Sequence, residues 1–160
     1  MNDPAKADHY FALGDRCLDD GDAAQAMKYF YRSAFFGRVA AMHSIAHCYL
    51  YGIGAAQDYD EAFHWFGQAV EGGCPQGMYH LGLCHEEGYG TPKNGEQALA
   101  WYLQSAGRGD EDAEYRVGRC HEEGIGAPVN LERAREWYAK AAARGQPEAR
   151  ERLEALRGGS

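Results

Sequence analysis

Residues 77–112 read GMYHLGLCHEEGYGTPKNGEQALAWYLQSAGRGDED, and related stretches of equal length stand directly before and after them. Residues 41–76 begin AMHSIAHCYLYG and residues 113–148 begin AEYRVGRCHEEG, so the three copies share one register. One tryptophan and one alanine recur every 36 residues, at Trp65, Trp101, Trp137, Ala62, Ala98 and Ala134. A period of this length indicates a repeat protein that stacks small helical units.

Two weaker copies flank these three. Residues 5–40 match over Leu13-Gly14 and Tyr29-Phe30, with a shorter link at Gly21-Asp22, and the segment from Pro147 restarts a unit and stops. We therefore predict one domain over residues 1–157. Its parts are repeats at about 5–40, 41–76, 77–112 and 113–148, a capping helix at 147–157 and a flexible tail at 158–160.

Each unit is predicted to form two helices. In the third copy Met78, Leu81 and Cys84 are three residues apart, and after the Gly88-Tyr89-Gly90 break a second helical pattern runs through Ala98 to Ala106. Alternation of the kind found in strands is absent from the sequence. The pattern predicts an all-α fold, an α/α superhelix (solenoid) of four helix-turn-helix repeats closed by a capping helix.

The ends of the second helices carry recurring signals. Favoured N-cap residues precede them at Asp58, Asn94 and Asn130. Glu61 and Gln97 stand three residues after two of these caps, which predicts a reciprocal capping box. Helix-ending glycines are predicted at Gly73, Gly109 and Gly145.

The units resemble Sel-1-like repeats, which are relatives of tetratricopeptide repeats with a longer interhelical loop. The residues that carry the resemblance in the third copy are Leu81-Gly82, Gly88-Tyr89-Gly90, Ala98, Trp101-Tyr102, Ser105-Ala106 and Gly109. The first copy, with its short link, resembles an ordinary tetratricopeptide repeat more closely. The resemblance implies a binding module that acts as an adaptor or scaffold for another protein, and it implies roles in bacteria.

Composition excludes several classes of function. The formal net charge of −8 disfavours binding to nucleic acid, because phosphates require clustered Lys and Arg. The sequence has no signal-peptide pattern and no apolar stretch that would span a membrane, and its five cysteines do not form close pairs. We expect a cytoplasmic protein with reduced thiols, although a trimmed exported protein would give the same pattern.

The sequence CHEEG, at residues 84–88 and 120–124, resembles a set of metal ligands. Four consecutive helical residues point through about 300°, so they do not converge on one ion. We therefore predict that Cys84, Cys120, His85 and His121 pack in the core, that no metal or other cofactor is bound there, and that Cys74 is the most reactive thiol. His43 and His47 are four residues apart, and whether they bind a metal stays open.

Catalytic signatures are not found. The sequence has no P-loop and no Gly-x-Ser-x-Gly elbow, and Gly88-Tyr89-Gly90 recurs once per repeat, as a structural turn does. We predict that the chain is not an enzyme and has no catalytic residues.

Tetratricopeptide geometry, carried over through the resemblance, predicts a concave groove lined by the first helix of each unit. Its predicted partner-binding residues are Phe11, Asp15, Asp19, His43, His47, Tyr51, Tyr79, Leu83, Glu86, Glu87, Tyr115, Arg119, Glu122 and Glu123. The four aromatic residues among them, excluding the histidines, are candidate anchors. The carboxylates form a predicted acidic rim, which favours a partner protein or peptide with a basic or mixed basic-apolar segment.

Two alternatives stay open at this point. As an alternative to the adaptor or scaffold, the repeats are also consistent with a self-associating structural protein that forms a homodimer. A metal-dependent or thiol-dependent activity at the cysteines and histidines is a third hypothesis.

Overall fold

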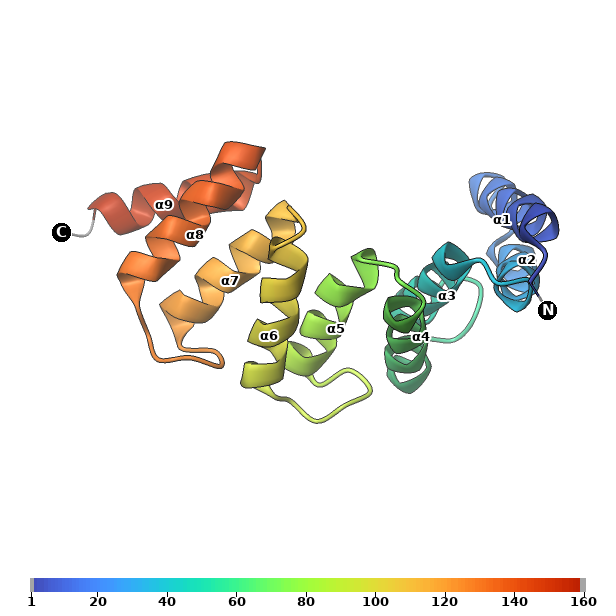
Figure 1. Ribbon diagram of the computed structural model, residues 1–160, viewed down its shortest axis with the longest axis horizontal. Helices are drawn as coiled ribbons and strands as arrows, with labels where there is room; N and C mark the ends of the chain where they lie inside the picture. The colour runs from blue at the N-terminus through green and yellow to red at the C-terminus, as the bar shows by residue number, and fades with distance from the viewer. Residues whose placement is uncertain (1, 159–160) are drawn as a thin grey trace. The chain divides into compact units, whose positions relative to one another are not determined.

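The computed structural model describes residues 2–158 of the chain. Within those residues there are nine α-helices and no strand, so the predicted all-α class is confirmed (Figure 1). Two compact units are distinguished. Unit 1 comprises the residues up to Gly77 together with Tyr89–Thr91, and unit 2 comprises Met78–Gly88 and the residues from Pro92 onward. The assignment of residues 1–157 to a single domain stays a prediction.

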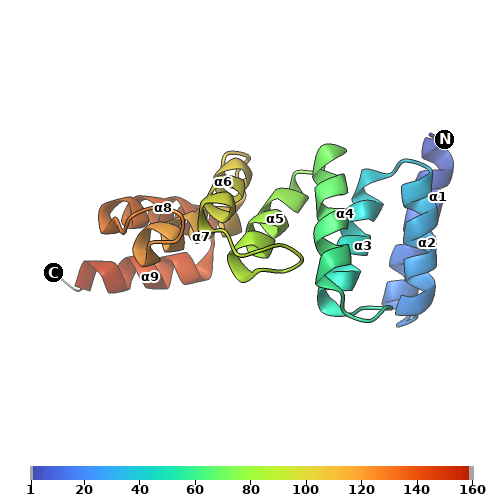
Figure 2. The ribbon, with the colours of Figure 1, turned by 90° about the horizontal axis from the view of Figure 1, so that it is seen from below.

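Unit 1 contains the first two helix pairs, which stand side by side (Figure 2). Its helices are α1 (Pro4–Asp19), α2 (Ala23–Phe35), α3 (Val39–Tyr51) and α4 (Tyr59–Glu71). The core between them is built on the fully buried side chains of Phe30 and Ile45, with Cys48 and Met27 beside them. Each helix therefore buries one apolar face against its neighbours, as the 36-residue period requires.

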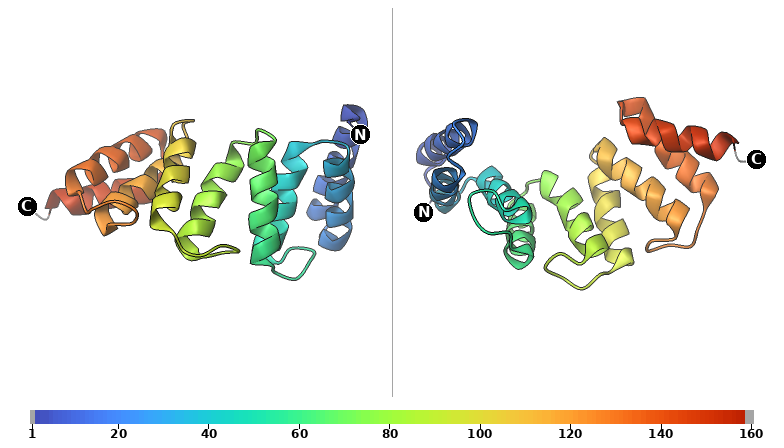
Figure 3. Two further views of the ribbon diagram at one scale, coloured as in Figure 1. Left: turned by 60° about the horizontal axis from the view of Figure 1, so that its bottom comes forward. Right: turned by 180° about the vertical axis from the view of Figure 1, so that it is seen from behind.

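Unit 2 contains the last two helix pairs and the closing helix, in which α8 packs against both α7 and α9 (Figure 3). Its helices are α5 (Gln76–Glu87), α6 (Gly95–Ala106), α7 (Glu111–Glu123), α8 (Leu131–Arg144) and α9 (Pro147–Gly158). Tyr102 and Val117 are fully buried in one cluster, and Tyr138 and Ala149 in a second. Because Ala149 lies on α9, the closing helix covers the apolar face of α8. Of the predicted tail, residues 159 and 160 lie outside the described residues.

The glycine in the middle of the first helix and the tyrosine of the Trp-Tyr pair, which recur in the sequence, pack against each other in the structure. A Cβ atom on Gly82 would lie 2.6 Å from the ring of Tyr102, and one on Gly118 would lie 2.7 Å from the ring of Tyr138. In these two repeats the second helix thus places an aromatic ring directly on the backbone of the first. Larger residues at these two positions would push the paired helices apart.

The Gly-x-Gly loop of a repeat contacts the repeat before it. In unit 2, Gly126 has a φ of +71°, and a Cβ atom there would lie 2.1 Å from the carbonyl oxygen of Gly95. Gly90 makes the equivalent approach to Tyr59, and Gly54 to Ala23. The residue approached is in each case the first residue of the second helix of the preceding repeat, so only glycine permits this loop contact.

The helix caps agree in part with the prediction. Asp58, Asn94 and Asn130 accept hydrogen bonds from backbone N–H groups of the following turn. The reciprocal capping box was wrong: the N–H of Asp58 donates to the carbonyl of Tyr49, and the carboxylate of Glu61 accepts from the indole of Trp65. The N–H groups of Asn94 and Asn130 likewise donate to carbonyls of the preceding helix, at 2.8 and 2.7 Å. These donors fasten the interhelical loop, which leaves the N3 side chain without its predicted role.

Candidate functional site

The predicted partner-binding residues lie on the first helix of each pair. In each set the later residues stand four, seven or eight positions after the first, so each set lies on one helical face. Unit 1 holds Phe11, Asp15 and Asp19 on α1 and His43, His47 and Tyr51 on α3. Unit 2 holds Tyr79, Leu83, Glu86 and Glu87 on α5 and Tyr115, Arg119, Glu122 and Glu123 on α7. We call the α5 and α7 sets together the inner face of unit 2.

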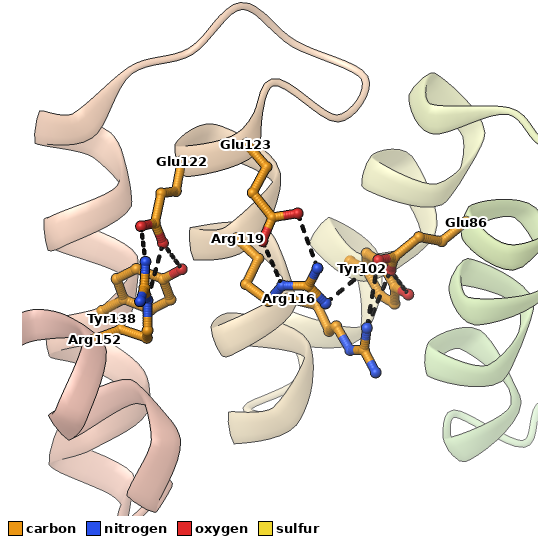
Figure 4. Close-up of polar contacts among 8 residues, drawn as sticks. All are labelled: Glu86, Tyr102, Arg116, Arg119, Glu122, Glu123, Tyr138 and Arg152. Atoms are coloured by element: carbon orange, nitrogen blue, oxygen red, sulfur yellow. Dashed lines mark hydrogen bonds and ion pairs between the residues drawn. The ribbon is translucent and has the colours of Figure 1, made fainter.

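Glu86 is more buried than we predicted for a residue of the acidic rim. Its side chain is 8% exposed, and its Oε2 accepts a hydrogen bond of 2.5 Å from the hydroxyl of Tyr102. Arg116 and Arg119 donate to the same carboxylate at 3.3 and 3.5 Å (Figure 4). A buried carboxylate requires such partners because desolvation disfavours its charge. The charge of Glu86 is therefore balanced by Arg116 and Arg119, and its prediction as an exposed acid of the rim was wrong.

Glu122 has the same arrangement one repeat later. Its side chain is 12% exposed, the hydroxyl of Tyr138 donates to it at 2.6 Å, and Arg152 of α9 forms an ion pair with it (Figure 4). Burial acts to raise the pKa of Glu122, but the hydrogen bonds from Arg152 and Tyr138 outweigh it and hold the pKa below the usual range. The second predicted rim acid is thus also paired, and it ties α9 to α7.

The two acids that remain exposed differ from each other. Glu123 accepts hydrogen bonds of 3.0 and 2.9 Å from Arg119, four residues earlier on the same helix. Glu87 is exposed, and within residues 2–158 no cation forms an ion pair with it. Four carboxylates and three arginines meet on this face and its edge, so its negative charge is far smaller than the sequence predicted.

The tyrosines of the inner face are half-buried. The ring of Tyr79 lies 5.8 Å from that of Tyr102, with the guanidinium of Arg116 6.0 Å from its centre. Tyr115 lies 5.6 Å from Tyr138 in the equivalent place. Each tyrosine is thus held on one side by a core ring, which limits the conformational entropy that a partner must remove on binding.

Unit 1 presents a different chemistry on the equivalent face. Asp15 and Asp19 are exposed, and partial burial together with the charge of Asp19 raises the pKa of Asp15. Along α3 the rings of His43 and His47 are 6.3 Å apart, and those of His47 and Tyr51 are 4.5 Å apart. Burial lowers the pKa of His47, which favours its neutral form.

Phe11, the remaining predicted anchor of unit 1, is covered. The guanidinium of Arg38 lies 4.3 Å from the centre of its ring, and the ring of Phe30 lies 5.6 Å away. Arg38 also forms an ion pair with Asp8. A partner therefore meets the cation and not the aromatic face at this position.

The CHEEG residues separate as expected. Cys84 and Cys120 are buried at 0% and 1% exposure and His121 is also buried, which confirms the predicted core positions of these three. His85 is only half-buried, so its predicted core position is not confirmed. Among the described residues no three His, Cys, Asp or Glu side chains are arranged to hold a metal ion. Cys74 is half-buried, as is Cys17, and the Sγ of Cys74 donates to Gln76 at 3.1 Å.

Sequence reasoning included Arg119 but missed Arg116 and Arg152, which also hold the buried acids, although a signal was present. Where the second helix carries tyrosine, at Tyr102 and Tyr138, the first helix carries glutamate; where it carries phenylalanine, at Phe30 and Phe66, the first helix carries leucine. The four pairs are Leu18 with Phe30, Leu50 with Phe66, Glu86 with Tyr102, and Glu122 with Tyr138. A hydroxyl thus accompanies each carboxylate, and the arginines stand 30 residues after it, at Arg116 and Arg152.

The chain belongs to the Sel1 repeat family. The model of that repeat matches residues 9–34, 39–74, 75–110 and 111–146, which together cover most of the sequence. This confirms the resemblance, and with it the class of helix-turn-helix repeat proteins. No curated protein matched the chain.

Several solved structures are similar to the chain. A Sel1 repeat protein from Oxalobacter formigenes is 26% identical over 94% of this chain and 61% of its own, with a TM-score of 0.84. The antigen c5321 of uropathogenic Escherichia coli, described as protective and as having an SLR fold, is 27% identical over 94% and 33%, with a TM-score of 0.83. Cysteine rich protein B of Helicobacter pylori shares the fold at 22% identity over 82% and 95%, with a TM-score of 0.62. The chain spans less than two thirds of the first two proteins. No helix within residues 2–158 is long and apolar enough to cross a membrane.

Proposed function

We propose that the chain is a protein-binding module that acts as an adaptor or scaffold, and that the inner face of unit 2 binds a segment of a partner protein. The observation that carries this proposal is the pairing of half-buried Tyr79 and Tyr115 with a network of charged groups held in place by the core. Tyrosine and arginine are the residues that most often supply binding energy at protein interfaces. Repeat scaffolds place such residues on the face formed by successive first helices.

The charges favour a mixed basic-apolar segment over a strongly basic one. On the inner face of unit 2, Glu87 is exposed and forms no ion pair within residues 2–158, so one basic side chain of the partner is expected to contact it. Apolar side chains are expected to contact Tyr79 and Leu83. The arginines that neutralise Glu86 and Glu122 leave little charge for further cations.

Affinity capture from the native cell extract tests this proposal. The double variant Tyr79→Ala, Glu87→Lys removes the anchor and reverses the exposed charge. The matched control is Leu103→Ala, Glu132→Lys, which makes the same kinds of change at exposed positions of α6 and α8. A partner that is retained by the native protein and the control but lost with the inner-face variant supports the proposal. If every captured protein binds the two variants equally, the inner face is not the binding surface.

A further inference from the structure

A half-open cavity of about 500 Å3 lies in unit 2, and it shares no residue with the inner face. Trp137, Lys140 and Arg144 of α8 form one wall, Glu114 of α7 another, and Gly107 lies at the end of α6. The volume falls in the range of about 300–1,000 Å3 that is typical of ligand sites. Ala106 and Ala143 add apolar surface.

A buried acid fixes Arg144 in this wall. The side chain of Glu114 is 4% exposed, and the Nε of Arg144 donates to both of its oxygens at 3.1 Å. Both bonds use Nε, so the two Nη groups of Arg144 are not engaged by this carboxylate. Guanidinium Nη groups held in one orientation suit recognition of a planar carboxylate.

Lys140 supplies a second cation. Its Nζ lies 4.1 Å from the centre of the Trp137 ring, and within residues 2–158 it forms no ion pair with a carboxylate. Trp137 is half-buried and Lys140 is exposed, so the cation is held weakly over the ring, whereas a charge-assisted hydrogen bond to a carboxylate is stronger. A ligand carboxylate would therefore draw Lys140 from the ring and leave the indole to contact an apolar group.

The other repeats do not have this combination. The residues that take the positions of Gly107, Glu114, Lys140 and Arg144 are Phe35, Met42, Gln68 and Gly72 in the second copy and Glu71, Met78, Gln104 and Arg108 in the third. Trp65 and Trp101 preserve the tryptophan. Because the second copy packs without the acid and the two cations, helix packing does not require them in the fourth.

We propose that this cavity binds the C-terminal residue of a partner polypeptide. The terminal carboxylate lies between Lys140 and Arg144, and the apolar side chain contacts Trp137. Charge complementarity supports this occupant: the cavity holds two cations and one acid that is already paired, in a chain of net charge −8. The proposal does not depend on the inner face, which has a different charge pattern.

Titration followed by NMR tests the site in the full chain. The probes are the tetrapeptide Ac-Ala-Ala-Ala-Leu with a free carboxylate, the same peptide as its C-terminal amide, and N-acetyl-leucine. We expect the indole N–H signal of Trp137, assigned with Trp137→Phe, to move with the free peptide, while Trp65 does not respond. The amide should bind roughly tenfold more weakly or worse, because it loses the charge-assisted bonds. Equal shifts with acid and amide would overturn the proposal, and N-acetyl-leucine binding as tightly as the peptide would overturn the polypeptide as the occupant.

The variant Lys140→Gln installs the residue of the second and third copies, Gln68 and Gln104, at an exposed position. It should weaken binding of the free peptide roughly fivefold or more, since one of two cationic contacts is lost. Lys93→Gln makes the same charge change in an exposed loop and should leave binding unchanged. Unchanged affinity in Lys140→Gln would rule the site out. The inner-face variant Tyr79→Ala, Glu87→Lys should bind the peptide with native affinity. The experiment therefore tests the cavity independently of the proposed function of the inner face.

Discussion

At the scale of single residues, the buried glutamates explain the choice between tyrosine and phenylalanine in the second helix of each repeat. Glu86 and Glu122 are nearly inaccessible to water, and each accepts a tyrosine hydroxyl as well as arginine. A carboxylate that loses a partner in such a place keeps its desolvation cost. The hydroxyl is therefore required where the acid is present and unnecessary beside Leu50.

Tyr102→Phe tests this dependence. Removing the hydroxyl deprives buried Glu86 of its shortest hydrogen bond, and we expect the free energy of unfolding to fall by about 1–3 kcal/mol. Tyr51→Phe, at a side chain that is 55% exposed, should change it by less than about 0.5 kcal/mol. Urea denaturation of both variants measures the difference. A loss in Tyr102→Phe no larger than in Tyr51→Phe would mean that the arginines alone satisfy Glu86.

The cysteines give a second residue-scale prediction. Burial raises the pKa of the Cys84 and Cys120 thiols to about 12 and also raises that of Cys48, so these three stay protonated and enclosed. Cys17 and Cys74 are only half-buried. With a disulfide reagent at pH 8, two thiols should react quickly in the folded protein and three slowly. In urea all five should react at similar rates. Fast modification of Cys84 or Cys120 in the folded protein, located by mass spectrometry, would contradict the burial argument.

Periodicity predicts the side of a helix on which a residue lies, but not its partner. The spacing from Leu81 placed Cys84 in the core, where it lies. The same spacing directed Glu86 toward the inner face, yet the depth of its side chain depends on Arg116, which is 30 residues away and on another helix. Contacts between helices of successive repeats, such as that between Glu86 and Arg116, depend on how the repeats pack. They can be read from sequence only by comparing the same position across the four copies.

At the scale of elements, the interhelical loop is the part of the unit least tolerant of change. Gly126→Ala places a methyl group 2.1 Å from the carbonyl oxygen of Gly95 and also requires a side chain at a φ of +71°. We expect a loss of more than about 3 kcal/mol, because about 1–2 kcal/mol arises from the left-handed backbone alone and the clash adds to it.

Gly145→Ala is the matched control in the same unit. Gly145 has a φ of +110°, and nothing lies within 4 Å of its added Cβ, so only the backbone term applies. Thermal or urea unfolding should rank the variants with Gly126→Ala clearly the less stable. Equal losses of unfolding free energy in the two variants would show that the loop moves away from Gly95 at little cost. The contact would then not stabilise the packing of the fourth repeat against the third.

The helix ends show how far local signals reach. Asp58, Asn94 and Asn130 were predicted as N-caps from residue type and phase, and their side chains accept the expected backbone hydrogen bonds. The reciprocal bond from Glu61 was not found, since the N–H that it would accept from donates to Tyr49. A capping box is inferred from four consecutive residues. The N–H of Asp58 instead donates to the carbonyl of Tyr49, which lies nine residues earlier in α3. Local rules fail where tertiary contacts supply a better partner.

At the scale of the whole molecule, the 36-residue period predicts the helices and their order, because every copy solves the same packing problem. The binding surface is not predicted in the same way. Positions that pack are similar in each copy, whereas Leu50 and Glu86, or Met42 and Glu114, occupy equivalent places with different chemistry. The binding function of a repeat protein depends on the positions that differ between its repeats. A single sequence identifies these positions but not the ligand that they bind.

The stability of the chain should fall in two stages as the solution is acidified from pH 7.5. Burial lowers the pKa of His47, His85 and His121 below the usual 6.5, so the unfolded chain binds more protons than the folded one as pH falls through about 6.5, and stability is lost there. Glu122 has a folded pKa below its usual 4.5. Its contribution is present above that value and is lost as pH falls through the lowered pKa.

The first stage is measured by urea denaturation at pH 7.5, 6.5 and 5.5 in about 0.15 M salt, which screens the change in surface charge. We expect the free energy of unfolding to decrease across this range. In His121→Gln the decrease should be smaller, because one buried group no longer takes up a proton on unfolding, while the exposed His9→Gln should follow the native protein. Buried histidines would be excluded as the cause if stability were constant or rose toward pH 5.5, or if both variants showed the same slope as the native chain.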